Sequence, residues 1–420
     1  MLTRGRDGGS RLDLLWSPRY LRGPPATVRI GCRGIIPRRG RMIGKGHTME
    51  TSEERQMLKE SIGRLLAELA GLDGVAGHEQ AVVSELRKLF MPFAEDVTID
   101  SFGNLYARIN AEGSGPTLMI SAHSDEIGAL VKSIEPSGML RIERVGGLIE
   151  TLAIGRHVRV RGHRGVIGVK AGHIQTADER GRAPSFRELY VDMGFDTVAE
   201  VENLGIRVGD AVAYDEPMEW LANPDRVSGK ALDNRVSCAL LVTLAERLQG
   251  TSLGCTLYCV VTVQEEVGLR GARMAAHRLN PAAAIVVDTV PSGGTPDVDF
   301  HRDLRMRIGG GPVLGLASVG GAAGHLINPG MRDFLREAAD AAGITLQEAL
   351  FYGGTSDASA VHLVRDGIPT GVVNIARRYS HSPVETLDLN DVVDTLELLE
   401  SSARRFGPDV DLGFLTSAWG

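Results

Sequence analysis

A strand that ends in two adjacent acids constrains the fold of this chain more than any other segment. Leu257–Val263 is apolar and rich in β-branched side chains, which is typical of a strand buried on both faces. Glu265 and Glu266 follow it, and then Gly268 and Gly271. In open α/β sheets the carboxyl ends of the strands form the ligand crevice. The segment therefore predicts a functional site at this strand end, although an isolated Glu-Glu pair is more often only solvated.

Helical and extended patterns alternate on both sides of this strand. Apolar residues recur at helical spacing in 50–72, Glu79–Phe90 and Val236–Leu248. Short apolar runs typical of strands occupy Val97–Ile99, Leu105–Ile109, Thr117–Ser121, Ala282–Val287 and Gly371–Ile375. This alternation is typical of α/β proteins. We therefore expect a central mixed, largely parallel sheet flanked by helices.

Residues 128–218 have a different pattern. They contain short β-rich pieces punctuated by glycine, at Met139–Arg144, His157–Arg161, Val166–Gly172 and Ala211–Tyr214, and one helical stretch at Ala199–Leu204. Short strands separated by turn residues are typical of small barrels. We predict an all-β domain at 128–218, inserted into an α/β domain of residues 49–127 and 219–420. No role is assigned to its histidines, His157, His163 and His173.

The first 48 residues form a basic extension. They hold 11 arginines and lysines against two aspartates, with scattered glycine and proline and no sustained period. Such a composition cannot bury enough apolar surface to become ordered. It could be a nucleic-acid or membrane arm, a targeting peptide, or translated upstream sequence. We favour the last, because Met49 directly precedes ETSEE (50–54), which is typical of a helix start.

Charge and composition narrow the class of protein. The net charge of −7 leaves about −16 on the residues after the basic extension, so we expect no nucleic-acid partner for them. No run approaches 18 apolar residues, which predicts no membrane span and no membrane partner. The four cysteines, Cys32, Cys238, Cys255 and Cys259, show no paired spacing, and we expect a reducing, cytoplasmic setting.

Acids and imidazoles also follow other predicted strands. They are His123 and Asp125 after Thr117–Ser121, Asp288 after Ala282–Val287, His381 after Gly371–Ile375, and Asp233 at a helix start. Taken singly, a histidine is more often structural, and an aspartate at a helix start is more often an N-cap. Together, two imidazoles with three or four carboxylates and no thiolate indicate a hydrolytic site for two divalent ions, Zn²⁺, Co²⁺ or Mn²⁺.

Six segments resemble, in order, the motifs of the tetrahedral (TET-type) metallo-aminopeptidases, a family also labelled glutamyl aminopeptidase or endoglucanase M. They are SAHSDEIG (121–128), SGKALDNR (228–235), VQEEVGLRGA (263–272), VVDT (286–289), GGTSDA (353–358) and YSHSPVE (379–385). The resemblance covers roughly residues 55–405. One departure is the serine of GGTSDA, which the commoner GGTDA lacks.

The resemblance implies roles for individual residues. One divalent ion would be bound by His123, Asp233 and Asp288, and the second by Asp233, Glu266 and His381, with Asp233 bridging. Glu265 would be the general base, and Asp125 would orient His123. The implied cofactors are two divalent metal ions per subunit, zinc or cobalt first and manganese as an alternative.

The resemblance also implies the reaction and the assembly. Peptide substrates would lose their N-terminal residue, as two ions acidify a bridging water and Glu265 moves its proton to the leaving amine. The inserted domain would be a PDZ-like dimerisation domain. The homo-oligomer would be a tetrahedral dodecamer built from dimers.

Other functions are compatible with part of this pattern. A deacylase or carboxypeptidase would use the same ligand residues, which do not encode the specificity pocket. A non-catalytic peptide-binding scaffold would be favoured by loss of a ligand or of the base, and none is missing. A glycosidase needs carboxyl groups that face each other across about 5 to 9.5 Å, whereas Glu265 and Glu266 are adjacent.

We predict that the basic extension is dispensable. A chain that begins at Met49 should keep its solubility, assembly and peptidase activity, because residues 1–48 contain no core-forming pattern. Activity assays and gel filtration of both chains would check this. Loss of folding in the shorter chain, or strong hydrogen-exchange protection of residues 10–40 in the longer one, would contradict it.

Overall fold

The structure is a computed structural model that describes residues 52–110, 115–320 and 323–415. The basic extension and Cys32 lie outside these residues. The three other cysteines, Cys238, Cys255 and Cys259, are buried and free.

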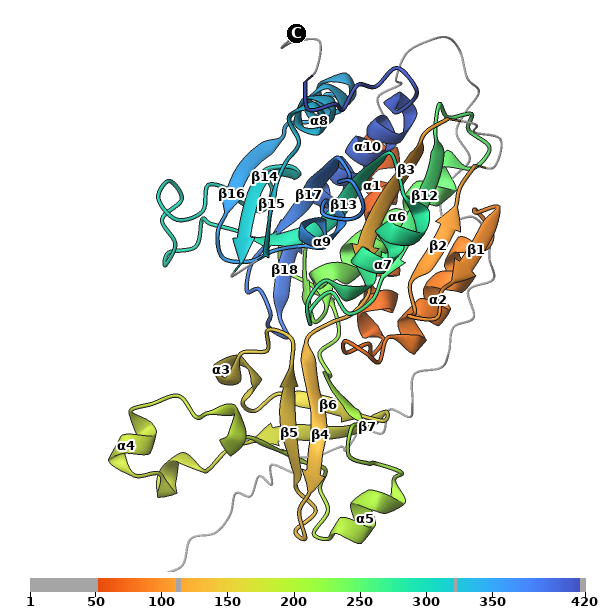
Figure 1. The fold of residues 1–420 in the computed structure, drawn as a ribbon. Helices are drawn as coiled ribbons and strands as arrows, with labels where there is room; N and C mark the ends of the chain where they lie inside the picture. Colours follow the sequence, from red (N-terminus) through yellow and green to blue (C-terminus); the bar gives the residue numbers. More distant parts are fainter. Residues whose placement is uncertain (1–51, 111–114, 321–322, 416–420) are drawn as a thin grey trace, which may run out of the picture. The chain divides into compact units, whose positions relative to one another are not determined.

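Nine strands of the described chain form one mixed sheet, in the order β1-β2-β12-β3-β13-β17-β14-β15, with β16 beside β14 (Figure 1). The strands are β1 (Asp96–Ile99), β2 (Leu105–Arg108), β3 (Thr117–His123), β12 (Thr256–Thr262), β13 (Ala283–Pro291), β14 (Val313–Gly320), β15 (Ala323–Leu326), β16 (Gln347–Phe351) and β17 (Thr370–Arg377). The central neighbours β12, β3, β13 and β17 are parallel. The pairs β1–β2, β2–β12, β14–β17 and β14–β15 are antiparallel. The predicted α/β fold with a central mixed sheet is confirmed, and its parallel pairing is concentrated at the centre.

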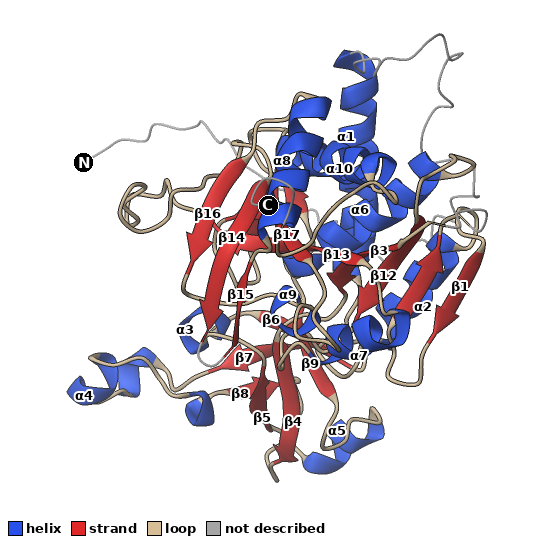
Figure 2. Cartoon of the chain, turned by 45° about the horizontal axis from the view of Figure 1, so that its top comes forward, coloured by secondary structure: helices blue, strands red, loops and turns tan. Residues whose placement is uncertain are grey.

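Helices cover both faces of this sheet (Figures 1 and 2). They are α1 (Ser52–Gly71), α2 (Gln80–Phe90), α6 (Leu232–Leu248), α7 (Arg270–Leu279), α8 (Pro329–Ala342), α9 (Ala358–Val361) and α10 (Leu389–Arg405). α1, α6 and α10 contact one another, with α2 beside α6 and α8 beside α10. α7 and α9 contact each other and lie against β12, β3, β13 and β17.

The central strands are mostly apolar up to their carboxyl ends because both of their faces are covered. Met119, Val260 and Val286 point to one side and pack with Ala272 and Ala276 of α7. Since side chains alternate along a strand, the residues between them point to the opposite layer. This packing explains why these strands read as continuous apolar runs.

Two parts of the sheet differ from the prediction. Asp288 lies inside β13 rather than beyond its end, because the strand continues to Pro291 after the apolar run stops. The strands β14, β15 and β16 were not predicted. β14 has a register shift between Gly315 and Ala317, and glycine within a strand weakens the alternation that identifies one.

Six antiparallel strands within 128–218 close into a barrel in the order β4-β5-β8-β7-β6-β9, which confirms a small all-β module. The elements are β4 (Gly128–Ile134), β5 (Leu140–Val145), α3 (Glu150–Ala153), β6 (His157–Val160), β7 (His163–Gly168), η1 (Gly172–Ile174), α4 (Ala177–Arg180), η2 (Phe186–Glu188), β8 (Tyr190–Asp192), α5 (Val198–Asn203) and β9 (Ala211–Tyr214). Leu140, Val160 and Val191 belong to its core. A three-stranded sheet follows, β10 (Glu219–Trp220), β11 (Arg226–Gly229) and β18 (Glu385–Asp388).

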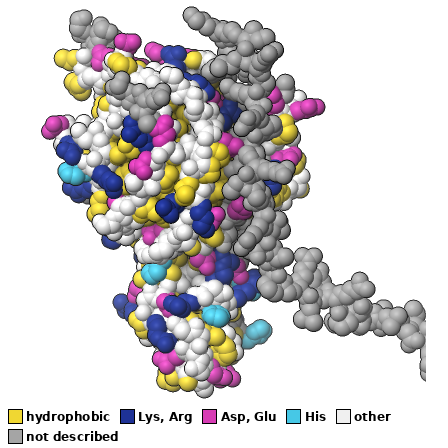
Figure 3. Space-filling view, turned by 90° about the vertical axis from the view of Figure 1, so that its right-hand side faces the viewer, with side chains coloured by type: hydrophobic (Ala, Val, Ile, Leu, Met, Phe, Trp, Pro, Cys, Tyr) yellow, Lys and Arg dark blue, Asp and Glu magenta, His cyan; other side chains and the backbone are white. Residues whose placement is uncertain are grey.

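The described residues include no candidate membrane span, and one face of the molecule carries charges of both signs (Figure 3). Within the described ranges, no helix has the length and apolarity needed to cross a membrane. On the visible part of the face in Figure 3, basic and acidic side chains are interspersed among apolar ones.

A buried ion pair joins the two points where the chain crosses between the large sheet and the barrel. Glu126 lies just before β4, and Lys230 lies just after β11. The Lys230 Nζ donates to both Glu126 oxygens at 2.8 Å and to the Leu72 carbonyl at 3.0 Å. The Gly74 N–H also donates to Glu126, at 2.9 Å. Breaking such a pair leaves an uncompensated buried charge.

We predict that Lys230→Met destabilises the fold by about 3 to 5 kcal/mol, the usual effect of removing one partner of a buried pair. Thermal and denaturant unfolding would measure the loss. The double variant Lys230→Met/Glu126→Gln should lose less than the sum of the single variants. Lys132 pairs with Glu143 at 2.7 Å on the surface, so Lys132→Met is a matched control that should change stability little. Equal losses for Lys230→Met and Lys132→Met would contradict the prediction.

Candidate functional site

The structure brings all seven predicted site residues to one edge of the central sheet. His123 ends β3, Asp125 follows it, Glu265 and Glu266 lie in the turn after β12, and His381 lies beyond β17. Asp288 comes from β13, and Asp233 comes from the start of α6. Because β12, β3, β13 and β17 are neighbours and parallel, their carboxyl ends meet at this edge.

Two groups of side chains at this edge have a geometry suited to a cation. His123, Asp233 and Asp288 form one group, and Asp233, Glu266 and His381 form the other. Within each group the nitrogen and oxygen atoms lie within 4.8 Å of one another. Asp233 belongs to both, with its Oδ1 3.2 Å from His123 Nε2 and its Oδ2 3.6 Å from His381 Nε2.

Asp233 reaches the site because the first turn of α6 is irregular. Its φ and ψ are −78° and 106°, which are not helical values. The helix is preceded by Ala231 in a left-handed conformation, and no side chain caps it. Asp233 is therefore not an N-cap of α6, which was the more common role for an aspartate at a helix start. Its carboxylate instead points toward the two histidines.

Asp125 is connected to both glutamates as well as to His123. Its Oδ1 accepts the N–H of Glu265 at 2.9 Å, and its Oδ2 accepts the N–H of Glu266 at 3.0 Å. The same Oδ1 lies 3.5 Å from His123 Nδ1, and the Asp125 backbone carbonyl lies 3.2 Å from that nitrogen. Asp125 therefore holds the glutamate turn against the end of β3.

Glu265 differs from Glu266 in its surroundings. It belongs to neither candidate cation group, although its Oε2 lies 4.0 Å from His123 Nε2. The turn that carries both residues begins at Gln264, whose φ is 59°, and continues to Gly268, whose φ is 121°. These two conformations end the strand and place adjacent glutamates at the same cleft. The cleft has a volume of about 520 Å³ and is lined by both carboxylates and both histidines.

Burial controls the ionisation of these carboxylates. Burial raises the pKa of Glu265 well above its usual value, and repulsion from Asp288 and Glu266 adds to this. Burial also raises the pKa of Glu266, to about 8. The pKa of Asp233 would rise for the same reason, but Arg377 and the imidazoles hold it well below its ordinary value. An array of like charges that resists full ionisation is typical of a functional site.

The imidazoles respond in the opposite direction. Burial by itself would lower the pKa of His123, but Glu265 and the other carboxylates raise it well above its ordinary value. Burial would likewise lower the pKa of His381, but Asp233 and Glu266 raise it to about 9. The carboxylates thus favour the protonated, positively charged form of both imidazoles.

The donor atoms fit divalent cations. Asp233 Oδ1 is buried and has no hydrogen-bond partner among the described residues. Carboxylate oxygen and imidazole nitrogen without thiolate are the ligands of hydrolytic sites for Zn²⁺, Co²⁺ and Mn²⁺. Arg377 is the one lysine or arginine among the residues that line the cleft, all of them described, so the acids exceed the fixed positive charge. Bound cations would coordinate Asp233 Oδ1 and would balance the excess of acidic groups.

Three further residues of the site had no predicted role, and two of them, Glu385 and Asp357, lie in the motifs quoted from the sequence. Arg377 ends β17, donates to Asp233 Oδ2 at 2.5 Å and to Thr289 Oγ1 at 2.6 Å, and forms an ion pair with Glu385. Glu385 Oε2 accepts the Asp233 N–H at 2.9 Å. A buried strand that ends in arginine is the signal that could have identified Arg377.

Asp357 is the third of these residues. Its Oδ2 accepts the hydroxyl of Thr262 at 2.6 Å, and its other oxygen is buried without a partner among the described residues. Burial raises its pKa to about 7. The GGTSDA motif that contains Asp357 was the available signal.

The inserted barrel also contacts the site, although it contains none of the predicted ligand residues. The Gly147 carbonyl lies 3.2 Å from His381 Nδ1. A Cβ at Gly147 would stand 2.2 Å from that same nitrogen, so only glycine permits this approach. The segment after β5 therefore positions the ring of His381.

Comparison with known proteins agrees with this geometry. Residues 103–398 match the family described as M42 glutamyl aminopeptidase. The chain is 30% identical to the lysyl aminopeptidase of Pyrococcus furiosus, over 82% of this chain and 97% of that protein. A TET aminopeptidase from a marine sediment archaeon, Thaumarchaeota archaeon SCGC AB-539-E09, is 30% identical, with a TM-score of 0.80 over 85% of this chain and 99% of the other. The TET1 peptidase of Pyrococcus horikoshii, described as assembling into a tetrahedron or a large octahedral shell, is 29% identical, with a TM-score of 0.72 over 82% of this chain and 100% of the other.

Proposed function

Since this chain belongs to the M42 glutamyl aminopeptidase family and is a peptide hydrolase, we propose that it removes N-terminal residues from peptides at the edge of β12, β3, β13 and β17. The observation that carries this proposal is the shared carboxylate of Asp233, which lies between two candidate cation groups in a cleft of about 520 Å³. A cleft of that volume accommodates the end of a peptide.

We assign the ligand roles from these two groups. His123, Asp233 and Asp288 would hold one divalent ion, and Asp233, Glu266 and His381 the second. When bound, two such ions polarise a scissile carbonyl and acidify water. Arg377 and Glu385 would keep Asp233 in place through its carboxylate and its N–H. Zinc or cobalt remains the prediction for the metal, with manganese as the alternative.

Glu265 would act as the general base. It removes a proton from the attacking water as the carbon–oxygen bond forms, and delivers that proton to the amine as the carbon–nitrogen bond breaks. The geometry supports this assignment because Glu265 lines the cleft but lies outside both cation groups. Asp125 would position it by accepting its N–H.

Related reactions on the same residues are the alternative. A deacylase or carboxypeptidase would need the same ligands, so an assay must separate the three reactions. The substrates are peptides with a free N-terminus and N-acetylated peptides. Analysis of the products shows whether residues are lost from the N-terminus or from the C-terminus. Cleavage confined to N-acetylated substrates, or at the C-terminus, would contradict the aminopeptidase proposal.

We predict different losses for the two adjacent glutamates. Glu265→Gln should bind two metal ions while its turnover of an aminoacyl-p-nitroanilide falls by about 10² to 10⁴, the usual contribution of a positioned base. Glu266→Gln should lose one ion, and excess metal should partly restore its activity, because an amide is a weaker ligand than a carboxylate. Metal analysis after gel filtration, run beside the assay, measures both. Equal metal loss in the two variants would show that base and ligand are wrongly assigned.

We also propose that the chain has three parts and forms a homo-oligomer. The parts are the extension 1–48, the catalytic domain of 49–127 and 219–420, and the PDZ-like dimerisation domain 128–218. The tetrahedron or octahedral shell described for the Pyrococcus horikoshii TET1 peptidase supports a homo-oligomer, and the assembly that we propose for this chain is a dodecamer built from dimers. A cytoplasmic setting remains a prediction, in keeping with the free cysteines.

Native mass spectrometry should therefore show dimers or dodecamers. Leu130 and Ala211 are paired neighbours on β4 and β9, so a short linker between them can replace residues 131–210. This deletion should abolish the larger species, while circular dichroism and thermal unfolding verify the remaining domain, because the deletion also removes Gly147 beside His381. A full-length chain that is monomeric at micromolar concentration would contradict the proposal.

A further inference from the structure

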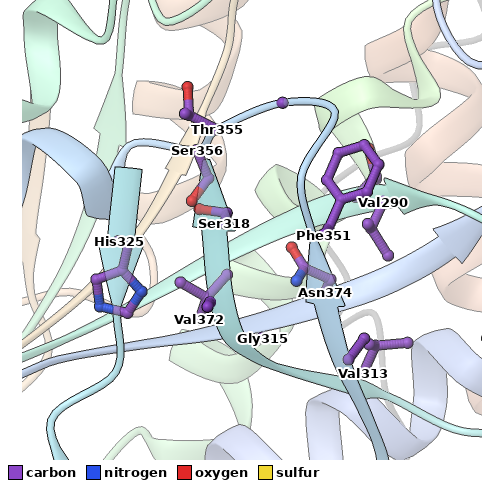
Figure 4. A pocket seen from close by; sticks show the side chains of 14 residues that line it. Val290, Val313, Gly315, Ser318, His325, Phe351, Thr355, Ser356, Val372 and Asn374 are labelled. Atoms are coloured by element: carbon purple, nitrogen blue, oxygen red, sulfur yellow. The ribbon is translucent and has the colours of Figure 1, made fainter. Parts of the chain in front are cut away.

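A second cavity, of about 50 Å³, adjoins the catalytic cleft. Thr289, Phe351, Gly354 and Thr355 line both spaces. Thr289 directly follows Asp288 in β13, so the cavity begins one residue from a proposed metal ligand. The rest of its wall comes from β13, β14, β15, β16, β17 and the loop before α9 (Figure 4).

The wall of this cavity contains no lysine, arginine, aspartate or glutamate among its 14 residues, all of which are described. Val290, Val313 and Val372 supply apolar surface. His325 is neutral, because burial lowers its pKa to about 4, and its Nε2 lies 3.0 Å from the Thr370 carbonyl. The cavity is therefore uncharged.

Two hydroxyl groups in the wall lack partners. The Oγ atoms of Ser318 and Ser356 are buried and have no hydrogen-bond partner among the described residues. Figure 4 shows both serines at the same end of the cavity, away from Val313. Ser356 is the serine that distinguishes GGTSDA from GGTDA. Buried polar groups normally have partners, so two orphans in one cavity indicate that a ligand supplies them.

We infer that this cavity receives the side chain of the substrate's N-terminal residue, and that it selects small side chains with a hydroxyl group, those of threonine and serine. The inference rests on the proposed function, because it assumes that the scissile bond lies at the proposed metal site. The bond to be cleaved would then stand beside Asp288, with the first side chain directed past Thr289 into the cavity.

The volume of the cavity limits the size of the side chain that can enter it. A cavity of about 150 Å³ holds benzene, which has six heavy atoms. By the same scale, about 50 Å³ holds about two heavy atoms, which matches the atoms of threonine or valine beyond Cβ when Cβ lies at the mouth that the cavity shares with the cleft. Leucine and larger side chains do not fit without movement of the wall.

The chemistry of the wall limits it further. A lysine or glutamate side chain would be buried without an opposite charge, which is strongly unfavourable. Valine has nearly the shape of threonine but would leave Ser318 and Ser356 unpaired. Threonine and valine are therefore a matched pair of substrates that isolates the hydroxyl contribution.

The test measures kcat/KM for the p-nitroanilides of threonine, valine, serine, alanine, leucine, lysine and glutamate. We expect threonine to exceed valine by about 3- to 10-fold, the effect of a neutral hydrogen bond. Lysine and glutamate should be lower by about 100-fold or more. Ser318→Ala and Ser356→Ala should each bring the threonine-to-valine ratio toward one by lowering kcat/KM for threonine more than kcat/KM for valine.

Ser359→Ala is the matched control. Ser359 is also buried with an unpartnered Oγ, but it lines neither the cavity nor the cleft. Its removal should leave the threonine-to-valine ratio unchanged. The thermal midpoints of all three variants should stay close to that of the unaltered protein, since none of these hydroxyls has a partner in the described chain.

A binding measurement tests this inference separately from the proposed function. Calorimetry with free L-threonine and L-valine should show tighter binding of threonine that Ser318→Ala and Ser356→Ala remove. If no aminoacyl derivative is cleaved but this difference in binding persists, the proposed function fails together with the assignment of the cavity to the N-terminal residue of a substrate, and only the selection of a hydroxyl side chain stands. If the chain cleaves substrates but treats threonine and valine alike, or prefers leucine, lysine or glutamate, the inference is wrong and the proposed function stands.

Discussion

The concentration of carboxylates at one edge of the central sheet is the constraint on which the rest of the site depends. Burying a carboxylate without a partner is costly, so each acid requires hydrogen bonds, a positive charge or a proton. Asp125 is stabilised by two backbone N–H groups, and Asp233 is stabilised by Arg377. Glu265 and Glu266 have no such cationic partner within hydrogen-bond reach in the described chain, and burial raises the pKa of each. The site therefore contains more acidic groups than its positive charges can balance, and bound divalent cations would allow these groups to ionise.

The fold concentrates these groups because its central strands are parallel and adjacent. Each of β3, β12, β13 and β17 delivers its side chains to the same edge, although the strands are far apart in the sequence. The buried pair of Glu126 and Lys230 joins the two chain crossings to the barrel close to this edge. Glu126 is the immediate neighbour of Asp125, so the inserted barrel and the site share one polar network. Gly147 then brings the barrel against His381.

The sequence indicated the central strands and the site because both have strong local signals. A strand covered on both faces reads as a continuous apolar run, and the acids and histidines stand out where such runs stop. The strands β14 to β16 lack that signal. β15 and β16 lie at the edge of the sheet, where polar residues and glycine are tolerated, and β14 contains Gly315 at its register shift. Arg377 and Asp357 were missed for a different reason. Each is a single charged residue whose importance comes from contacts with residues more than 80 positions away in the sequence.

The α/β class, the inserted β module and the seven candidate site residues could be predicted without coordinates, because periodicity and motif order are properties of the chain alone. Which residues are neighbours became known only from the fold. It placed Asp288 inside its strand, turned the carboxylate of Asp233 toward two histidines, and connected Asp125 to the glutamate turn. It also showed that Ser318 and Ser356, 38 residues apart, line one uncharged cavity beside the cleft. Such relations depend on strand register and on backbone conformations such as that of Gln264, which no local pattern in the chain encodes.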